Sequence, residues 1–222
     1  MNPKNVHFRF CQLLLASLLF LNYSCKKDSD NGLTDADGNV YHPVTIGSQQ
    51  WLVENLRTTH YNNGEAIPVV TDNSKWSNLA TGAYCTYPAE VTNGKDYGNL
   101  YNWYAATDSR KIAPKGWHVA TDADWQTLLN FIGAQNTGGK LKDTTHWNSP
   151  NTGATNATGF KGLPGGYVTS SIIYIGAYGF WWTATESSAT DAITRSLSYN
   201  NALVNNINYS KKYALTVRCV KD

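Results

Sequence analysis

The sequence lacks the motifs that mark the common enzyme classes. Its 222 residues contain no Gly-x-Ser-x-Gly elbow, no His-Glu-x-x-His zinc motif and no glycine-rich phosphate loop. The glutamates are too scattered to predict a pair for general acid–base chemistry, and the histidines are isolated. The sequence therefore favours a protein that is not an enzyme and predicts no cofactor and no metal site.

An excess of positive charge is also missing. Residues 1–24 carry two basic side chains and no acidic one, which leaves 16 basic and 16 acidic side chains in the rest of the chain. Nucleic-acid binding depends on clustered Lys and Arg that displace counterions from phosphates, and no basic stripe is found here. We therefore expect no nucleic-acid partner.

Methionine occurs only at position 1, whereas aromatic residues are abundant, with 8 Trp and 14 Tyr. Asn, Thr, Ser and Gly are plentiful as well. This composition is typical of a loop-rich extracytoplasmic module and not of a helical cytoplasmic enzyme. Residues 25–222 are enough for one sizeable domain and hardly enough for two.

Residues 1–24 have the pattern of a secretory signal peptide. Lys4 and Arg9 make a basic start, and residues 13–21 form an apolar run. The run is shorter than the roughly 18 residues that a membrane-spanning helix needs. Because Cys25 follows, the segment resembles a bacterial lipoprotein signal, in which the mature protein begins at a lipidated cysteine.

This resemblance implies a lipid anchor at Cys25 and a place in the cell envelope, at the outer membrane, with exposure on the cell surface left open. The next residues are polar and have nothing to bury, so residues 25–33 read as the lipidated cysteine and a tether. The folded domain is expected over residues 34–222.

Cysteine usage agrees with export. Cys85 and Cys219 remain once the signal and the lipidation site are set aside. Two thiols in an exported domain most often form a disulfide, which we predict here. A metal or redox pair is the alternative, but zinc would need two further ligands, and no Cys-x-x-Cys or His-x₃-His spacing supplies them.

Hydrophobic periodicity predicts an α+β domain. A hairpin is expected over residues 39–53, preceded by a turn at residues 35–39. The Asp-x-Asp-Gly of this turn also begins a calcium loop, but Ile46 stands where that loop needs a bidentate Glu. Residues 97–106 and the segment between Thr121 and Gly133 are expected to be helical.

Later in the chain a long loop region is expected over residues 134–176. Four strands should follow, at residues 179–185, 193–199, 203–207 and 213–220, as an antiparallel meander. In the last of these, alternation places Cys219 on the buried side of the strand.

Several short sequence motifs resemble those of the major paralogous domain family named after Fibrobacter succinogenes. They recur in order over nearly all of the chain beyond the signal. These motifs lie at residues 37–41, 46–51, 54–56, 97–103, 113–119, 159–160, 163–167 and 217–220. The resemblance implies a secreted protein or lipoprotein of the Bacteroidetes–Fibrobacter group.

A more distant resemblance concerns the fold. Residues 116–125 are similar to the Gly-Trp-x-x-Pro-Thr-x-x-Glu-Trp motif of formylglycine-generating-enzyme-like domains, with Ala120 in place of the Pro. Those domains are variants of the C-type lectin fold. The resemblance implies a small antiparallel or mixed sheet with two helices and long loops.

We predict a non-catalytic binding or adhesion module whose ligand is a glycan or a surface protein. The aromatics of the long loop region, and Tyr178 just after it, are the candidate contacts, because aromatic faces stack on sugars and anchor interfaces. They are Trp147, Tyr167, Tyr174 and Tyr178. For each of them the alternative is a place in a loop-rich core.

Other functions remain open at this point. A structural role in a surface assembly would suit the same composition. An oxidase related to the formylglycine-generating enzymes would resemble them in using copper at closely spaced cysteines, whereas only Cys219 lies in the C-terminal region here. Calcium-dependent sugar binding is disfavoured, because residues 146–151 lack the Glu-Pro-Asn or Gln-Pro-Asp triplet.

Overall fold

The computed structural model describes residues 32–91 and 94–222, and residues Gly32–Asp222 form one unit by their mutual contacts. The predicted signal peptide at residues 1–24, the predicted lipidation site Cys25 and all but the end of the predicted tether lie outside the described residues. The unit is mixed α+β, with many small sheets and few helices, as the sequence predicts in outline.

One four-stranded sheet has the order β12-β11-β10-β13. β10 (Tyr178–Glu186), β11 (Asp191–Ser198) and β12 (Asn205–Ser210) are antiparallel neighbours, and β13 (Thr216–Val217) runs parallel to β10. The predicted meander is therefore confirmed for its first three strands, although β12 begins later than expected.

The second four-stranded sheet has the order β3-β4-β14-β7. β3 (Pro43–Ile46) and β4 (Gln49–Leu52) form the predicted hairpin, and β14 (Cys219–Lys221) pairs with both β4 and β7 (Trp117–Val119). Gly47 turns the hairpin at φ 63°, a conformation that favours glycine.

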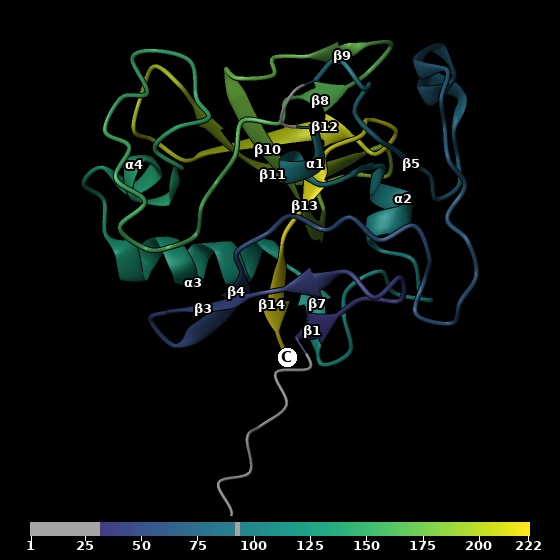
Figure 1. Cartoon of the computed structure of the whole chain (residues 1–222), viewed down its shortest axis with the longest axis horizontal. Coiled ribbons are helices and arrows are strands. Elements are labelled where there is room, and N and C mark those ends of the chain that lie inside the picture. Colours follow the sequence, from purple (N-terminus) through teal and green to yellow (C-terminus); the bar gives the residue numbers. More distant parts are fainter. Residues whose placement is uncertain (1–31, 92–93) are drawn as a thin grey trace, which may run out of the picture. The chain divides into compact units, whose positions relative to one another are not determined.

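The predicted single strand over residues 213–220 is wrong. The chain leaves one sheet after β13 and enters the other at β14, so the two short strands follow each other through the middle of the unit (Figure 1). Arg218 occupies the break. Its fully buried guanidinium donates to the backbone oxygens of Leu52, at 2.8 Å, and Phe160, at 2.6 Å.

Asn55 completes this buried network. Its Oδ1 accepts hydrogen bonds from Arg218 Nη2 and Trp181 Nε1, both at 2.8 Å, and its Nδ2 donates to the Tyr97 backbone oxygen at 2.9 Å. Five separate parts of the chain thus meet at one amide and one guanidinium. Several of the short motifs that carry the family resemblance belong to these parts.

The remaining strands form two-stranded pairs. They are β1 (Leu33–Thr34) with β2 (Val40–Tyr41), β5 (Tyr84–Cys85) with β6 (Leu100–Tyr101), and β8 (Tyr167–Val168) with β9 (Ile172–Ile173). Between β1 and β2 the carboxylate of Asp35 accepts from the backbone N–H groups of Asp37 and Asn39, so this segment is a turn, as expected.

α3 (Asp122–Ile132) is the helix that the sequence predicts best. Thr121 and Asp124 form a capping box at its start, and Gly133 ends it at φ 80°. Its apolar side, with Trp125 and Leu128, packs on the core.

The predicted helix over residues 97–106 is wrong. Two short helices, α1 (Gly94–Tyr97) and α2 (Trp103–Ala106), lie on either side of β6. Gly98 breaks the segment at φ 80°, packed so closely on residues 55 and 56 that a Cβ would lie 2.7 Å from a backbone oxygen. Asn102 then caps α2 by accepting from the Ala105 N–H.

α4 (Thr137–Leu141) and the 3₁₀ helix η1 (Asn73–Asn78) lie in stretches for which the sequence predicts only loops. α4 contains two buried glycines, which have no side chain to signal a helix by hydrophobic periodicity.

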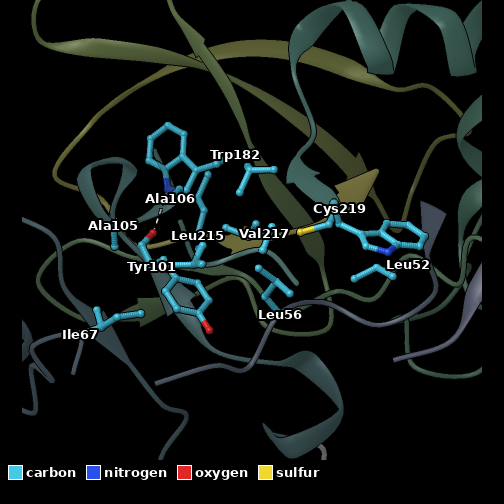
Figure 2. Close-up of a cluster of buried hydrophobic side chains, with 14 of the residues drawn as sticks. Leu52, Leu56, Ile67, Tyr101, Ala105, Ala106, Trp182, Leu215, Val217 and Cys219 are labelled. Atoms are coloured by element: carbon cyan, nitrogen blue, oxygen red, sulfur yellow. Dashed lines mark hydrogen bonds between the residues drawn. The ribbon is translucent and has the colours of Figure 1, made fainter. Parts of the chain in front are cut away.

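Both faces of the sheet β12-β11-β10-β13 are buried along the middle of β10, whereas the edge strand β12 is partly exposed. Trp182 lies on one face, where its Nε1 donates to the Tyr101 backbone oxygen at 2.8 Å, in a cluster with Leu215 and Val217 (Figure 2). Trp181 lies on the other face, in a cluster with Trp125 of α3. The sheet is thus the middle layer of the core.

The predicted disulfide is not formed. Cys85 and Cys219 are both free thiols, and they lie in different hydrophobic clusters. Figure 2 shows Cys219 beside Leu52 and Val217. Alternation along the last segment did predict the burial of Cys219, but burial does not bring it to its presumed partner, because Cys85 belongs to the separate β5–β6 pair.

Candidate functional site: a tyrosine surface

The structure brings three of the sequence-predicted binding residues together. The ring centroids of Tyr167 and Tyr174 are 5.9 Å apart, and those of Tyr174 and Tyr178 are 5.2 Å apart. Aromatic pairs interact favourably over this range. Trp147 is not part of this group.

Three further aromatics complete the cluster. Phe180 of β10, Tyr209 of β12 and Tyr213 lie around Tyr167, with ring centroids 5.0, 5.2 and 5.8 Å from it, respectively. We refer to Tyr167, Tyr174, Tyr178, Tyr209 and Tyr213 as the tyrosine surface.

Sheet geometry explains why these rings meet. Tyr178, Phe180 and Trp182 alternate along β10 and therefore share one face of the sheet. The register pairs Phe180 with Ser196 of β11, and Ser196 with Asn205 of β12, so that Tyr209 lies on the same face as Asn205. Tyr209 could have been identified from this alternation once the pairing of β12 was known.

The hairpin β8–β9 adds the remaining rings. It is attached to the sheet by a hydrogen bond from the Gly166 N–H to the Tyr178 oxygen, at 2.8 Å, and to the last segment by one from the Val168 N–H to the Ala214 oxygen, at 2.9 Å. Figure 1 shows the hairpin next to β12 and β10. These bonds fix Tyr167 against the sheet.

Exposure divides the cluster into a buried base and an accessible rim. Phe180 and Tyr167 are buried, at 3% and 9% exposure, whereas Tyr174 is 52% exposed. The side chains of Tyr178, Tyr209 and Tyr213 are partly buried. Rings that are held by one another and still reach solvent are suited to contact a ligand.

The backbone at Tyr174 is unusual. Its φ is 66°, in the left-handed region that aromatic residues rarely adopt, while the turn that follows is closed by N–H donation from Ala177 and Tyr178 to its oxygen. A non-glycine residue in this region costs of order 1 to 2 kcal/mol. The tyrosine is therefore retained at a position where glycine would be more favourable.

Two phenols of the surface, those of Tyr167 and Tyr209, stay neutral at physiological pH. Burial raises the pKa of Tyr167, and burial together with the neighbouring phenol of Tyr167 raises the pKa of Tyr209 further. The two rings are stacked, with their centroids 5.2 Å apart. The rings are thus fixed without any charged partner.

Trp147 lies in the core, at 7% exposure, which is the alternative weighed for it above. Its Nε1 donates to the Gly162 oxygen at 3.0 Å, and the ammonium of Lys142 lies 5.4 Å from its ring centroid. Burial lowers the pKa of Lys142 to about 8. This pair supports the long loop region and is separate from the tyrosine surface.

Among the histidine–carboxylate pairs of the described residues, His146 with Asp143 is the most buried. His146 Nδ1 lies 2.6 Å from Asp143 Oδ1. The same carboxylate oxygen accepts from the backbone N–H groups of Thr145 and His146, so Asp143 serves to close a loop. Although burial alone would raise its pKa, these hydrogen bonds lower the pKa of Asp143.

A second histidine is held between two carboxylates. His118 Nε2 lies 3.0 Å from Asp124 and Nδ1 lies 2.9 Å from Asp222, beside a pocket of about 350 Å³. Among the residues that the structure describes, no group of three or more His, Cys, Asp and Glu could hold a metal ion.

The structure therefore defines an α+β domain with a partly exposed aromatic surface. The profile of the Fibrobacter succinogenes major domain family matches residues 44–221, and the chain belongs to this family. No curated protein matches the chain, and no solved structure matches it. Within the described part of the chain, no helix is long and apolar enough to cross a membrane.

Proposed function

We propose that this protein is a lipid-anchored binding module of the cell envelope that contacts a glycan through the tyrosine surface. The observation that carries the proposal is the exposed ring of Tyr174 held against Tyr167 and Tyr178. Sugar rings present flat C–H faces, and aromatic side chains in fixed positions bind such faces at a low cost in conformational entropy.

A surface protein is the second candidate ligand, since tyrosines are also enriched at protein interfaces. The glycan is favoured because the accessible rim consists of single rings over a buried base, and the exposed large hydrophobic side chains of the described residues are otherwise few and include Phe131 and Leu203. A structural role in an assembly would call for a larger apolar patch.

An oxidase related to the formylglycine-generating enzymes is disfavoured. Cys85 and Cys219 lie in separate clusters, so they do not form a pair that could bind a soft metal. Burial raises the pKa of the Cys85 thiol to about 12 and raises that of Cys219 as well, which keeps both in the weakly binding thiol form.

The C-type-lectin-like fold remains part of the proposal. It is supported by an α+β architecture with small sheets, long loops and one well-formed helix, α3. This helix begins within residues 116–125, the motif that resembles formylglycine-generating-enzyme-like domains. An experimental structure, superposed on such domains, would test it. A different strand order in the core sheet would contradict it.

The lipid anchor is supported by the sequence pattern around Cys25. Metabolic labelling of cells with a palmitate analogue should label the full-length protein, and the variant Cys25→Ser should remain unlabelled. Equal labelling of both forms would show that Cys25 is not the lipidation site.

The binding proposal is tested with a soluble form, residues 26–222, which contains the whole described unit. Affinity electrophoresis against a panel of polysaccharides, with and without calcium, should show retardation that is lost in Tyr174→Gly and Tyr178→Ala. Phe131→Ala is the matched control, because Phe131 is 65% exposed and belongs to α3, outside the tyrosine surface. Retardation that persists in both tyrosine variants would exclude the tyrosine surface as the glycan-binding site.

A further inference from the structure

We propose that the tyrosine surface selects neutral polysaccharides and rejects acidic ones. This inference rests on the proposed function and names the class of glycan. It comes from the distribution of charge along the segments that build the surface.

The two segments that supply most of the surface contain no charged residue. Residues 162–185 include Tyr167, Tyr174 and Tyr178, and residues 196–210 include Tyr209. Neither segment contains Asp, Glu, Lys, Arg or His, although the chain as a whole carries 18 basic and 16 acidic residues. The absence of charge is therefore a local feature of this part of the molecule.

The lysines next to Tyr213 are engaged elsewhere. Lys211 is 4% exposed, and its ammonium lies 3.0 Å from Glu186 and donates to the Ala189 oxygen. Lys212 donates to the Ser77 oxygen at 2.7 Å. Lys211 is thus neutralised by a carboxylate, whereas Lys212 keeps its charge and is directed toward η1.

An acidic polysaccharide would find no cationic partner for its carboxylates in residues 162–185 or 196–210. Moving a carboxylate out of water against neutral rings is costly unless a cation or several donors compensate it. A neutral sugar ring avoids this cost, because its C–H face meets the aromatic rings while its hydroxyls keep contact with water or with amides.

β12 can supply one such amide to the tyrosine face, that of Asn205. It is the edge strand of its sheet, and Asn205, Ile207 and Tyr209 alternate onto the same face. Asn206 and Asn208 point the other way and are exposed. An asparagine side chain both donates and accepts hydrogen bonds without adding charge, which suits the hydroxyls of a neutral sugar.

The test measures binding of the soluble form to neutral, acidic and amine-bearing polysaccharides at low and at high salt. Suitable polymers are a mixed-linkage β-glucan, xylan and mannan, polygalacturonate and alginate, and chitosan. We expect a neutral polymer to bind at least about tenfold more tightly than either acidic one, a difference of about 1.4 kcal/mol. Because no ion pair contributes, binding to the neutral polymer should change less than about twofold with salt.

A charge-bearing variant sharpens the test. Asn205→Lys places a cation on the tyrosine face of β12 and should increase binding to polygalacturonate at low salt by about fivefold or more, with the gain lost at high salt. Asn205→Gln is the uncharged control and should leave the preference unchanged. Circular dichroism would confirm that both variants are folded.

The outcomes separate this inference from the proposed function. Acidic polymers or chitosan that bind as tightly as neutral ones would overturn the preference for neutral glycans. If Tyr174→Gly weakens the binding of all these polymers, the tyrosine surface is still supported as the binding site. If a neutral polymer binds but the tyrosine variants have no effect, the binding surface itself is wrong. If no polysaccharide binds, both proposals fail and a protein ligand gains support.

Discussion

At the scale of single residues, Tyr174 combines an exposed ring with an unfavourable backbone conformation. Its ring is the most exposed of the tyrosine surface, and its backbone occupies a region that disfavours every residue except glycine, asparagine and aspartate. Strained residues of this kind cluster at functional sites, and Lys111 and Lys161 share this backbone region here, at φ 60° and 52°. The strain is compensated in part by the contacts of the ring with Tyr167 and Tyr178.

Two substitutions at residue 174 should separate the effect of losing the ring on stability from the effect of the backbone conformation. Both Tyr174→Gly and Tyr174→Ala remove the ring, but only glycine also relieves the left-handed backbone, so the glycine variant should be more stable by about 1 kcal/mol. Urea unfolding would measure the difference. Equal stability of the two variants would show that the backbone at residue 174 relaxes at no cost.

His118 should make stability depend on pH. Burial by itself lowers the pKa of His118, but hydrogen bonds to Asp222 and Asp124 outweigh burial, so that the pKa is raised above its ordinary value of 6.5. Because the folded protein then binds this proton more tightly than the unfolded chain, the stabilisation is fully present below pH 6.5 and is lost as the pH rises through the raised pKa.

The measurement is the unfolding free energy from urea titrations between pH 5 and about 9. The wild-type value should fall as the pH rises above 6.5, and His118→Gln should remove that part of the fall. Asp222→Asn, which keeps only the Asp124 partner, should give an intermediate profile. A His118→Gln profile parallel to that of the wild type would contradict the assignment.

At the scale of elements, the two four-stranded sheets are joined by side chains of the loops and strand ends. Arg218 lies between β13 and β14, and Asn55 follows β4. Burial lowers the pKa of Arg218 to about 9, so the guanidinium stays protonated at neutral pH. Its charge is satisfied by oxygens and by the face of the Phe160 ring, 4.2 Å away.

Removing the Asn55 amide, which Arg218 and Trp181 share, should therefore lower the free energy of unfolding. Asn55→Ala leaves the buried Arg218 without its Oδ1 acceptor and the Trp181 Nε1 without a partner, and we expect a loss of about 3 kcal/mol or more in unfolding free energy. Asn208→Ala, at an exposed position of β12, is the control and should change stability by less than about 0.5 kcal/mol. Similar small losses in both variants would show that the network contributes little.

At the scale of the whole molecule, the described unit holds together by packing, with no disulfide among its described cysteines. Three hydrophobic clusters, one on each face of the core sheet and one around Trp76, contain most of its tryptophans. Cys85 and Cys219 contribute to two of these clusters as buried hydrophobic side chains, at 3% and 0% exposure.

We accordingly expect the thermal midpoint of the soluble form to be unaffected by a reducing agent. Both thiols should resist alkylation in the folded protein and react after denaturation without reductant, which mass spectrometry would count. A midpoint that falls on reduction, together with absence of alkylation before reduction, would restore the disulfide that the sequence suggested.

Local sequence signals predicted the elements whose causes are local. The β3–β4 hairpin and α3, with its Thr121 cap and its end at Gly133, follow from turn residues, caps and hydrophobic spacing over a few neighbouring positions. The same reasoning failed at residues 97–106, because Gly98 is fixed by a close approach to residues 55 and 56 that no local pattern reveals.

The sequence by itself determined the family, the α+β class and which aromatics to consider. Only the tertiary structure decided their placement, because Trp147 and Tyr174 both lie in the predicted loop region 134–176 and differ in what packs around them. It also added Tyr209 and Tyr213, which reach Tyr167 through strand pairing across more than one element. Burial and ring contacts depend on these long-range pairings, which the order of residues along the chain does not reveal.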